Sequence, residues 1–270
     1  MRHYKLALKA AHRRVAVELV RPDVGGAPPL LVILHGMWGL NDHVRDLAWR
    51  CARLGWAVLI PTLHGGRLGE ALAPERLIAL ERDLGVDLHA RPLTVPPLEL
   101  GASEWQRQTL AALHAIHSPQ QRAEWVADTW HVLRQVPAQM RVGEDVACLG
   151  LGTGGPVALD LGGRPRALIG CVSVCGGVPD QGLLARLTTP ALVIWGDIRQ
   201  LTAGLAVTTV GVVCEPGQVR TFDAEQPDFL DGRHSHWSSE AVSEAWSHVV
   251  EFLGARGGLI VAAEVGIALA

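Results

Sequence analysis

The chain has 270 residues, 49% of them hydrophobic, and a formal net charge of -3. Acidic and basic residues are interspersed, so no positive field exists for a polyanion and nucleic-acid binding is not expected. The length and the lack of a long flexible linker predict a single domain over residues 1–270. The apolar composition favours a parallel sheet buried on both faces.

The N-terminal segment lacks a signal for secretion. Residues 1–20 contain no uninterrupted apolar core and no small-residue cleavage site, which predicts a cytoplasmic protein. The chain has five cysteines, an odd number, and in a chain without an export signal they are expected to be free thiols.

The first predicted elements form a hairpin and the start of a sheet. Residues 4–8 and 15–20 alternate apolar and polar side chains, which predicts an antiparallel pair of edge strands. Residues 30–34 are a continuous apolar run of the buried-strand type. A helix is expected next, with Asp42 as its cap and Gly55 at its end.

The rest of the chain alternates strands with helices around one irregular insertion. Residues 66–135 form this insertion, with helices expected at 70–84, 103–116 and 119–135 and a proline-rich stretch that cannot be helical. The alternation predicts an α/β fold with a doubly wound, mostly parallel sheet and helices on both faces. The other strands are expected at 56–61, 145–151, 167–175, 190–196 and 219–222, and the other helices after Gly154, at 180–187 and at 238–254.

Four motifs follow one another along the chain: the strand and turn VILHGMWGLN, the strand–turn–helix VACLGLGTGG, the strand end CVSVCGG and the strand PALVIWG. In this order they resemble the dienelactone hydrolase family of the α/β-hydrolase superfamily. The resemblance spans roughly residues 28–253. It implies an α/β-hydrolase fold and, for an enzyme, hydrolysis of ester or lactone bonds.

The resemblance also implies where a catalytic triad should lie, and none of these positions holds a residue with the required chemistry. Gly152 stands where the family has a Cys or Ser nucleophile, and a glycine has no side chain to attack a carbonyl. The acid position is Arg199, with Asp197 the nearest carboxylate, and the position of the base is Pro227. The sequence therefore predicts a degenerate triad.

A binding site is still expected at the same place. Amides near Met37 and Thr153 could form an oxyanion-type cradle for a carbonyl or carboxylate. The leading hypothesis is a non-catalytic small-molecule-binding or interaction protein, although whether the chain is an enzyme stays open. The candidate pocket residues are His35, Gly36, Met37, Trp38, His64, Thr153, Cys175, Asp197 and His234.

Two alternatives remain. The first is an ester or lactone hydrolase with a rebuilt site, in which Cys175 supplies a thiol nucleophile or His234, in a loop, supplies the base. The second and weaker one is a dinucleotide site, because Gly150, Gly152 and Gly155 fit the G-x-G-x-x-G pattern. That pattern also needs an acid about 20 residues on, where the sequence has cysteine and glycine instead.

No cofactor or metal is expected, because no ligand spacing demands one. The apolar tail 255–270 is too short for a membrane span, which needs about 20 residues. Left in water, its segment 259–269 would promote aggregation, so we expect it to pack against the domain or, with a slight preference, against a second copy in a homodimer.

Overall fold

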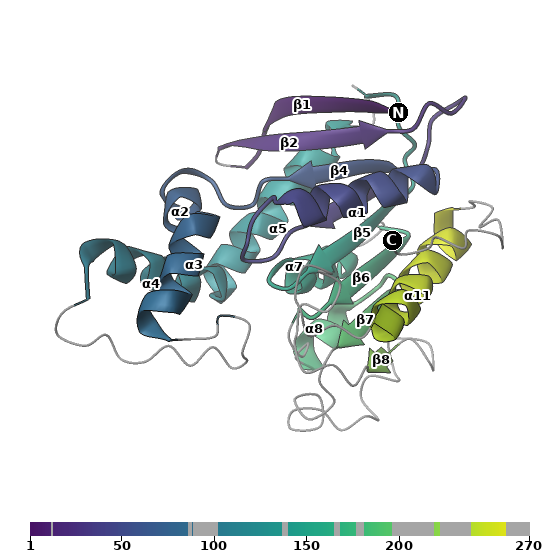
Figure 1. The fold of residues 1–270 in the computed structure, drawn as a ribbon. Helices are drawn as coiled ribbons and strands as arrows, with labels where there is room; N and C mark the ends of the chain where they lie inside the picture. Colours follow the sequence, from purple (N-terminus) through teal and green to yellow (C-terminus); the bar gives the residue numbers. More distant parts are fainter. Residues whose placement is uncertain are drawn as a thin grey trace.

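In the structure, a computed structural model, the described residues form one sheet of eight strands in the order β1-β2-β4-β3-β5-β6-β7-β8. Figure 1 shows this sheet running through the molecule with helices on both sides. The described residues are 1–11, 13–85, 88, 102–136, 140–164, 168–176, 181–195, 219–221 and 239–257.

The sheet is parallel from β4 to β8, and β2 runs antiparallel to both of its neighbours, β1 and β4. This confirms the predicted fold class. The strands are β1 (Arg2–Lys9), β2 (Arg14–Arg21), β3 (Leu30–Leu34), β4 (Ala57–Pro61), β5 (Val146–Leu151), β6 (Gly170–Val174), β7 (Ala191–Trp195) and β8 (Val219–Thr221).

Helices cover both faces of the sheet. Buried apolar side chains accordingly form two clusters, one on each face. In Figure 1, α1 and α11 lie on one side, and α5 and α7 lie on the other. The helices are α1 (Asp42–Arg53), α2 (Gly66–Ala71), α3 (Pro74–Leu84), α4 (Glu104–Ile116), α5 (Pro119–Leu133), α7 (Gly154–Gly162), α8 (Gln181–Arg186) and α11 (Ser239–Gly257).

The N-terminal hairpin is more deeply integrated than the sequence predicted. Strands β1 and β2 pair antiparallel, as expected, but β2 also pairs with β4, with Val17 opposite Pro61. Of the two hairpin strands, only β1 therefore lies at the edge of the sheet. The alternating pattern of β2 could not reveal this second pairing, because alternation records which face is buried and not which strand lies beside it.

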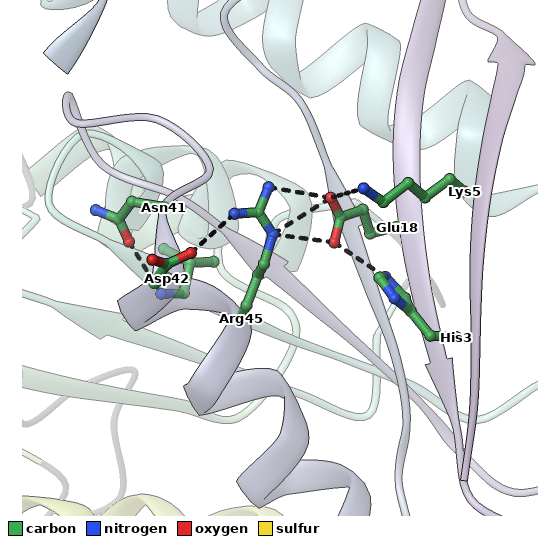
Figure 2. Close-up of polar contacts among 7 residues, drawn as sticks. His3, Lys5, Glu18, Asn41, Asp42 and Arg45 are labelled. Carbon is green, nitrogen blue, oxygen red and sulfur yellow. Dashed lines mark hydrogen bonds and ion pairs between the residues drawn. The ribbon is translucent and has the colours of Figure 1, made fainter.

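A charged group joins this hairpin to α1. The carboxylate of Glu18, on β2, is almost fully buried and contacts Arg45 of α1 at 3.2 Å and His3 of β1 at 3.0 Å. Lys5 lies 4.0 Å away (Figure 2). Burial favours the neutral acid, but Arg45 and then His3 outweigh it, and the pKa of Glu18 is below its usual value.

The cap of α1 differs from the prediction by one residue. Asn41 is the N-cap, and its side chain accepts a hydrogen bond of 3.0 Å from the Val44 amide. Asp42 is instead the first helical residue and contacts Arg45 at 3.2 Å (Figure 2). Asn and Asp cap helices equally well, so the sequence could not separate these two neighbours.

The predicted helix over 70–84 is two helices, α2 and α3. Pro74 begins α3, where its missing amide is tolerated and its ring prevents continuation from α2. The helices predicted at 103–116 and 119–135 match α4 and α5 to within two residues. The proline-rich stretch between α3 and α4 and the tail after Gly257 lie outside the described residues.

Candidate functional site

The carboxyl ends of four adjacent parallel strands, in the order β4-β3-β5-β6, carry most of the predicted site residues. His64 follows β4, His35 follows β3, Gly152 follows β5 and Cys175 follows β6. This edge is where open α/β sheets bind ligands. The fold therefore brings together residues that are far apart in the sequence.

Gly152 lies in a sharp turn between β5 and α7, as the glycine spacing predicted. Its φ of 49° is in the left-handed region, which side chains tolerate poorly. Its amide donates to the Val174 carbonyl at 2.9 Å, and its carbonyl accepts from the Gly155 amide at 2.9 Å. The turn has the form of a nucleophile elbow, and the residue at its apex has no side chain.

The neighbouring glycines are required by close packing. A Cβ atom on Gly150 would lie 2.5 Å from the carbonyl carbon of Gly154, and one on Gly155 would lie 2.7 Å from the Cα atom of Gly176. A Cβ atom on Gly154 would lie 2.8 Å from the carbonyl carbon of Leu34. Packing thus accounts for these glycines without any bound dinucleotide.

The turn after β3 contacts the elbow directly. A Cβ atom on Gly36 would lie 3.3 Å from the Leu151 carbonyl oxygen and 3.8 Å from the Cα atom of Gly152. The backbone hydrogen bonds of the described residues include none donated by the Met37 or Thr153 amide. Neither amide is thus engaged by a backbone carbonyl of the described chain, which is one condition for an oxyanion-type cradle.

His35 is fully buried and has no nitrogen left for chemistry. Its Nε2 accepts a hydrogen bond of 2.9 Å from the Leu63 amide, which assigns the ring proton to Nδ1, 2.9 Å from the Gly36 carbonyl. Burial lowers the pKa of His35 to about 4, only partly offset by the Gly36 hydrogen bond. His35 is therefore a neutral link between β3 and β4.

His64 packs against two rings and keeps a nitrogen free. Its ring centroid lies 4.7 Å from that of His35, edge to face, and 5.5 Å from that of Trp125 on α5. Burial, and then His35 and Arg13, hold the pKa of His64 well below its usual value, so the ring is neutral. Within the described chain, its buried Nε2 has no hydrogen-bond partner.

An ion pair that sequence reasoning missed supports this region. Arg13 donates to the buried Asp128 carboxylate at 2.6 Å and to the Leu63 carbonyl at 2.9 Å. It thereby joins the hairpin to α5 and to the chain that leads into His64. The sequence feature that could have revealed this ion pair is Asp128, a carboxylate among the mostly apolar positions that form the buried face of α5.

Thr153 and Cys175 both lie beside Gly152. Thr153 occupies the N-cap position of α7 without using its side chain as a cap, and its buried Oγ1 has no partner in the described part of the molecule. Cys175 is buried, and its φ of 52° is unusual for a residue with a side chain. Met37 is also buried, and Trp38 packs against the core.

Four predicted positions lie outside the described residues. They are Arg199 and Pro227, which the resemblance assigned to the acid and base positions, and the pocket candidates Asp197 and His234. The described ranges contain no group of three or more His, Cys, Asp or Glu side chains that could hold a metal ion. No described helix has the length and apolar character of a membrane span.

The fold and the elbow define the class: the chain belongs to the dienelactone hydrolase family, whose family model matches residues 15–256. This agrees with the resemblance that the motifs indicated. No curated protein matches the chain significantly by sequence.

Solved structures show the same fold at low sequence identity. A Klebsiella pneumoniae protein provisionally named a dienelactone hydrolase is 14% identical, with a TM-score of 0.68 over 93% of this chain and 98% of that one. A dienelactone hydrolase-like promiscuous phosphotriesterase from metagenomic libraries is 20% identical, with a TM-score of 0.62 over 94% and 98%. A dienelactone hydrolase from Anabaena variabilis is 18% identical, with a TM-score of 0.57 over 94% and 98%.

Proposed function

We propose that this member of the dienelactone hydrolase family binds a small molecule without hydrolysing it through a family-type triad. The observation that carries the proposal is Gly152, which occupies the apex of the strand-to-helix turn at a φ of 49°. The family mechanism needs a nucleophilic side chain there. The sequence supports the proposal further, because Arg199 and Pro227 stand at the positions of the family's acid and base.

The surviving backbone supports a binding role. The amides of Met37 and Thr153 lie in two contacting turns and are not used by the backbone hydrogen bonds of the described chain. Such donors can hold a carbonyl or carboxylate oxygen without any attacking group. The site would then bind a ligand and leave it unchanged.

The test is hydrolysis of p-nitrophenyl esters and cyclic lactones by the full chain and by Gly152→Ser. We expect no turnover by the native chain. Gly152→Ser alone should also give no burst of product, because a serine without a base is not activated. Native turnover that Cys175→Ala or His234→Ala abolishes would overturn the proposal.

A hydrolase with a rebuilt site is the second candidate, and one observation favours it. Cys175 has a φ of 52°, in the same region as Gly152, and follows the strand beside β5. Non-glycine residues in such conformations concentrate at active sites. If Cys175 were the nucleophile, Cys175→Ser would retain partial ester hydrolysis and Cys175→Ala would retain none.

For the tail, we propose that residues 259–269 dock against the domain or, more readily, against a second copy in a homodimer. The support is their apolar sequence, LIVAAEVGIAL, which would otherwise face water. Deletion of residues 258–270 should change the oligomeric mass measured in solution or the stability of the chain. A variant that stays monomeric with unchanged stability would eliminate both docking modes.

The cytoplasmic location likewise stays a prediction.

A further inference from the structure

Three buried polar atoms near the end of β4 take no part in the amide cradle of Met37 and Thr153. They are Nε2 of His64, Nε1 of Trp125 and Oγ1 of Thr129, and none has a hydrogen-bond partner in the described chain. All three residues are more than nine-tenths buried. Native proteins rarely leave such atoms unsatisfied, so three of them point to a missing partner.

The three atoms belong to residues that lie close together. The ring centroids of His64 and Trp125 are 5.5 Å apart. One oxygen atom with two hydrogen bonds of ordinary length spans about 6 Å, which is comparable with the separation of the two ring centroids. Thr129 follows Trp125 by four residues on α5, which places both on the same helix face.

The chemistry of these groups selects a neutral hydroxyl. The indole N–H of Trp125 can only donate, whereas the neutral His64 and the Thr129 hydroxyl can each donate or accept. A hydroxyl oxygen accepts from Trp125 and donates its proton to either of the others. A carboxylate could only accept, and its charge would be buried beside the apolar Leu63, with Arg13 already paired to Asp128.

We propose that His64, Trp125 and Thr129 bind the hydroxyl group of an apolar small molecule, such as a phenol or an alicyclic alcohol. This inference rests on the proposed function, because it names the ligand class of the same sheet edge. The amides of Met37 and Thr153, on the two contacting turns, remain available to a second oxygen of that ligand.

The experiment compares phenol with toluene, which has nearly the same shape and lacks the hydroxyl. Binding to the full chain is measured by calorimetry or ligand-observed NMR. We expect phenol to bind about tenfold more tightly, the ratio that one net hydrogen bond provides. His64→Phe and Trp125→Phe should each reduce the ratio to about threefold or less. Trp130→Phe is the matched control, since Trp130 lies under the Arg164 guanidinium instead, and it should keep the native ratio.

Thr129→Val keeps the side-chain shape and removes one hydroxyl, so it provides a test if the aromatic variants fail to fold. It should lower the affinity for phenol about threefold and leave toluene unaffected. Equal affinities for phenol and toluene would overturn the inference. A phenol-to-toluene affinity ratio that stays unchanged in all the variants would also overturn the inference. So would a site that holds a water molecule and binds neither phenol nor toluene. None of these results depends on ester hydrolysis, so failure of the proposed function would be seen separately.

Discussion

The Nε2 atom of His35 accepts the Leu63 amide at 2.9 Å, which links the turn after β3 to the chain after β4. The hydrogen bond requires the neutral ring, because a protonated imidazole has no acceptor. Since His35 is completely buried, its protonation would both break this link and place a charge in the core. Acid should therefore weaken the sheet edge that holds the candidate site.

We predict that the free energy of unfolding falls as the pH is lowered from 6.5 to about 4, the pKa of folded His35. The folded pKa lies below the unfolded value, so the unfolded chain binds more protons in this window and stability is lost as the pH falls. The pKa shift of His35 alone corresponds to a loss of about 3 kcal/mol in the free energy of unfolding. The lowered pKa of His64 acts in the same direction.

Urea unfolding at pH 7, 5.5 and 4.5 measures this effect. His35→Gln can still accept from Leu63 through its amide oxygen, and it should give a shallower pH dependence. His114→Gln, at an exposed position, should leave the dependence unchanged. Equal stability of the native chain at pH 7 and 4.5 would contradict the prediction.

Gly154→Ala should destabilise the chain more than Gly85→Ala. At Gly154 the new Cβ would lie 2.8 Å from the carbonyl carbon of Leu34 and 2.9 Å from the oxygen of His35, both backbone atoms. We expect a loss of about 3 kcal/mol from this overpacking. Gly85 has a φ of 61° and open space around it, so its loss should be about 1 kcal/mol of strain. Thermal or urea unfolding of the two variants would reveal a reversed order.

Arg45→Met should cost more stability than Arg50→Met on the same helix. Arg45 pairs with the buried Glu18, which among the described residues would then keep its contacts with His3 and Lys5. We expect a loss of about 2–3 kcal/mol, because an incompletely paired charge stays buried. Arg50 pairs with Asp46 at the surface, and its loss should cost less than about 1 kcal/mol. Equal losses, measured by urea unfolding, would show that Glu18 does not depend on Arg45.

The four described cysteines should not react with Ellman's reagent until the chain unfolds. Cys51, Cys148, Cys171 and Cys175 are all buried. Burial raises the pKa of Cys51 to about 12 and that of Cys148 well above its usual value, which suppresses the reactive thiolate. A Cys214→Ser variant isolates these four. Rapid labelling of the folded variant would contradict the prediction, and labelling abolished by Cys175→Ala would favour a thiol at the site.

The sequence predicted the central sheet well, because each buried strand is a short apolar run between recognisable turns. The run 30–34 is β3 to the residue, and the glycines around Gly152 correctly predicted a sharp turn. Local spacing determines both features. The cap of α1 was wrong by one residue, because Asn41 and Asp42 have similar capping propensities. The single helix predicted over 70–84 was also wrong, because Pro74 begins a new helix.

The surroundings of the site could not be predicted in the same way. Arg13 and Asp128 are 115 positions apart, and no periodic pattern links them. The contact between His64 and Trp125 depends on how α5 packs against the end of β4. The sequence marked His64 as a pocket candidate through its place after a strand. It could not show that Nε2 of His64 is buried with no hydrogen-bond partner among the described residues.

The close packing of Gly150, Gly154 and Gly155 shows that the glycine motif meets two separate requirements. One is the packing of the turn, and the other is the presentation of a nucleophile. In an active hydrolase the same glycines serve the turn and the nucleophile, so substitution there would abolish both folding and activity. Here the backbone of Leu34, Gly154 and Gly176 would collide with any added side chain whatever residue 152 is. A sequence motif defined by these glycines therefore detects the close packing between the strands and the helix of the turn. The glycines themselves carry no information about the nucleophile, which depends on the residue at the apex.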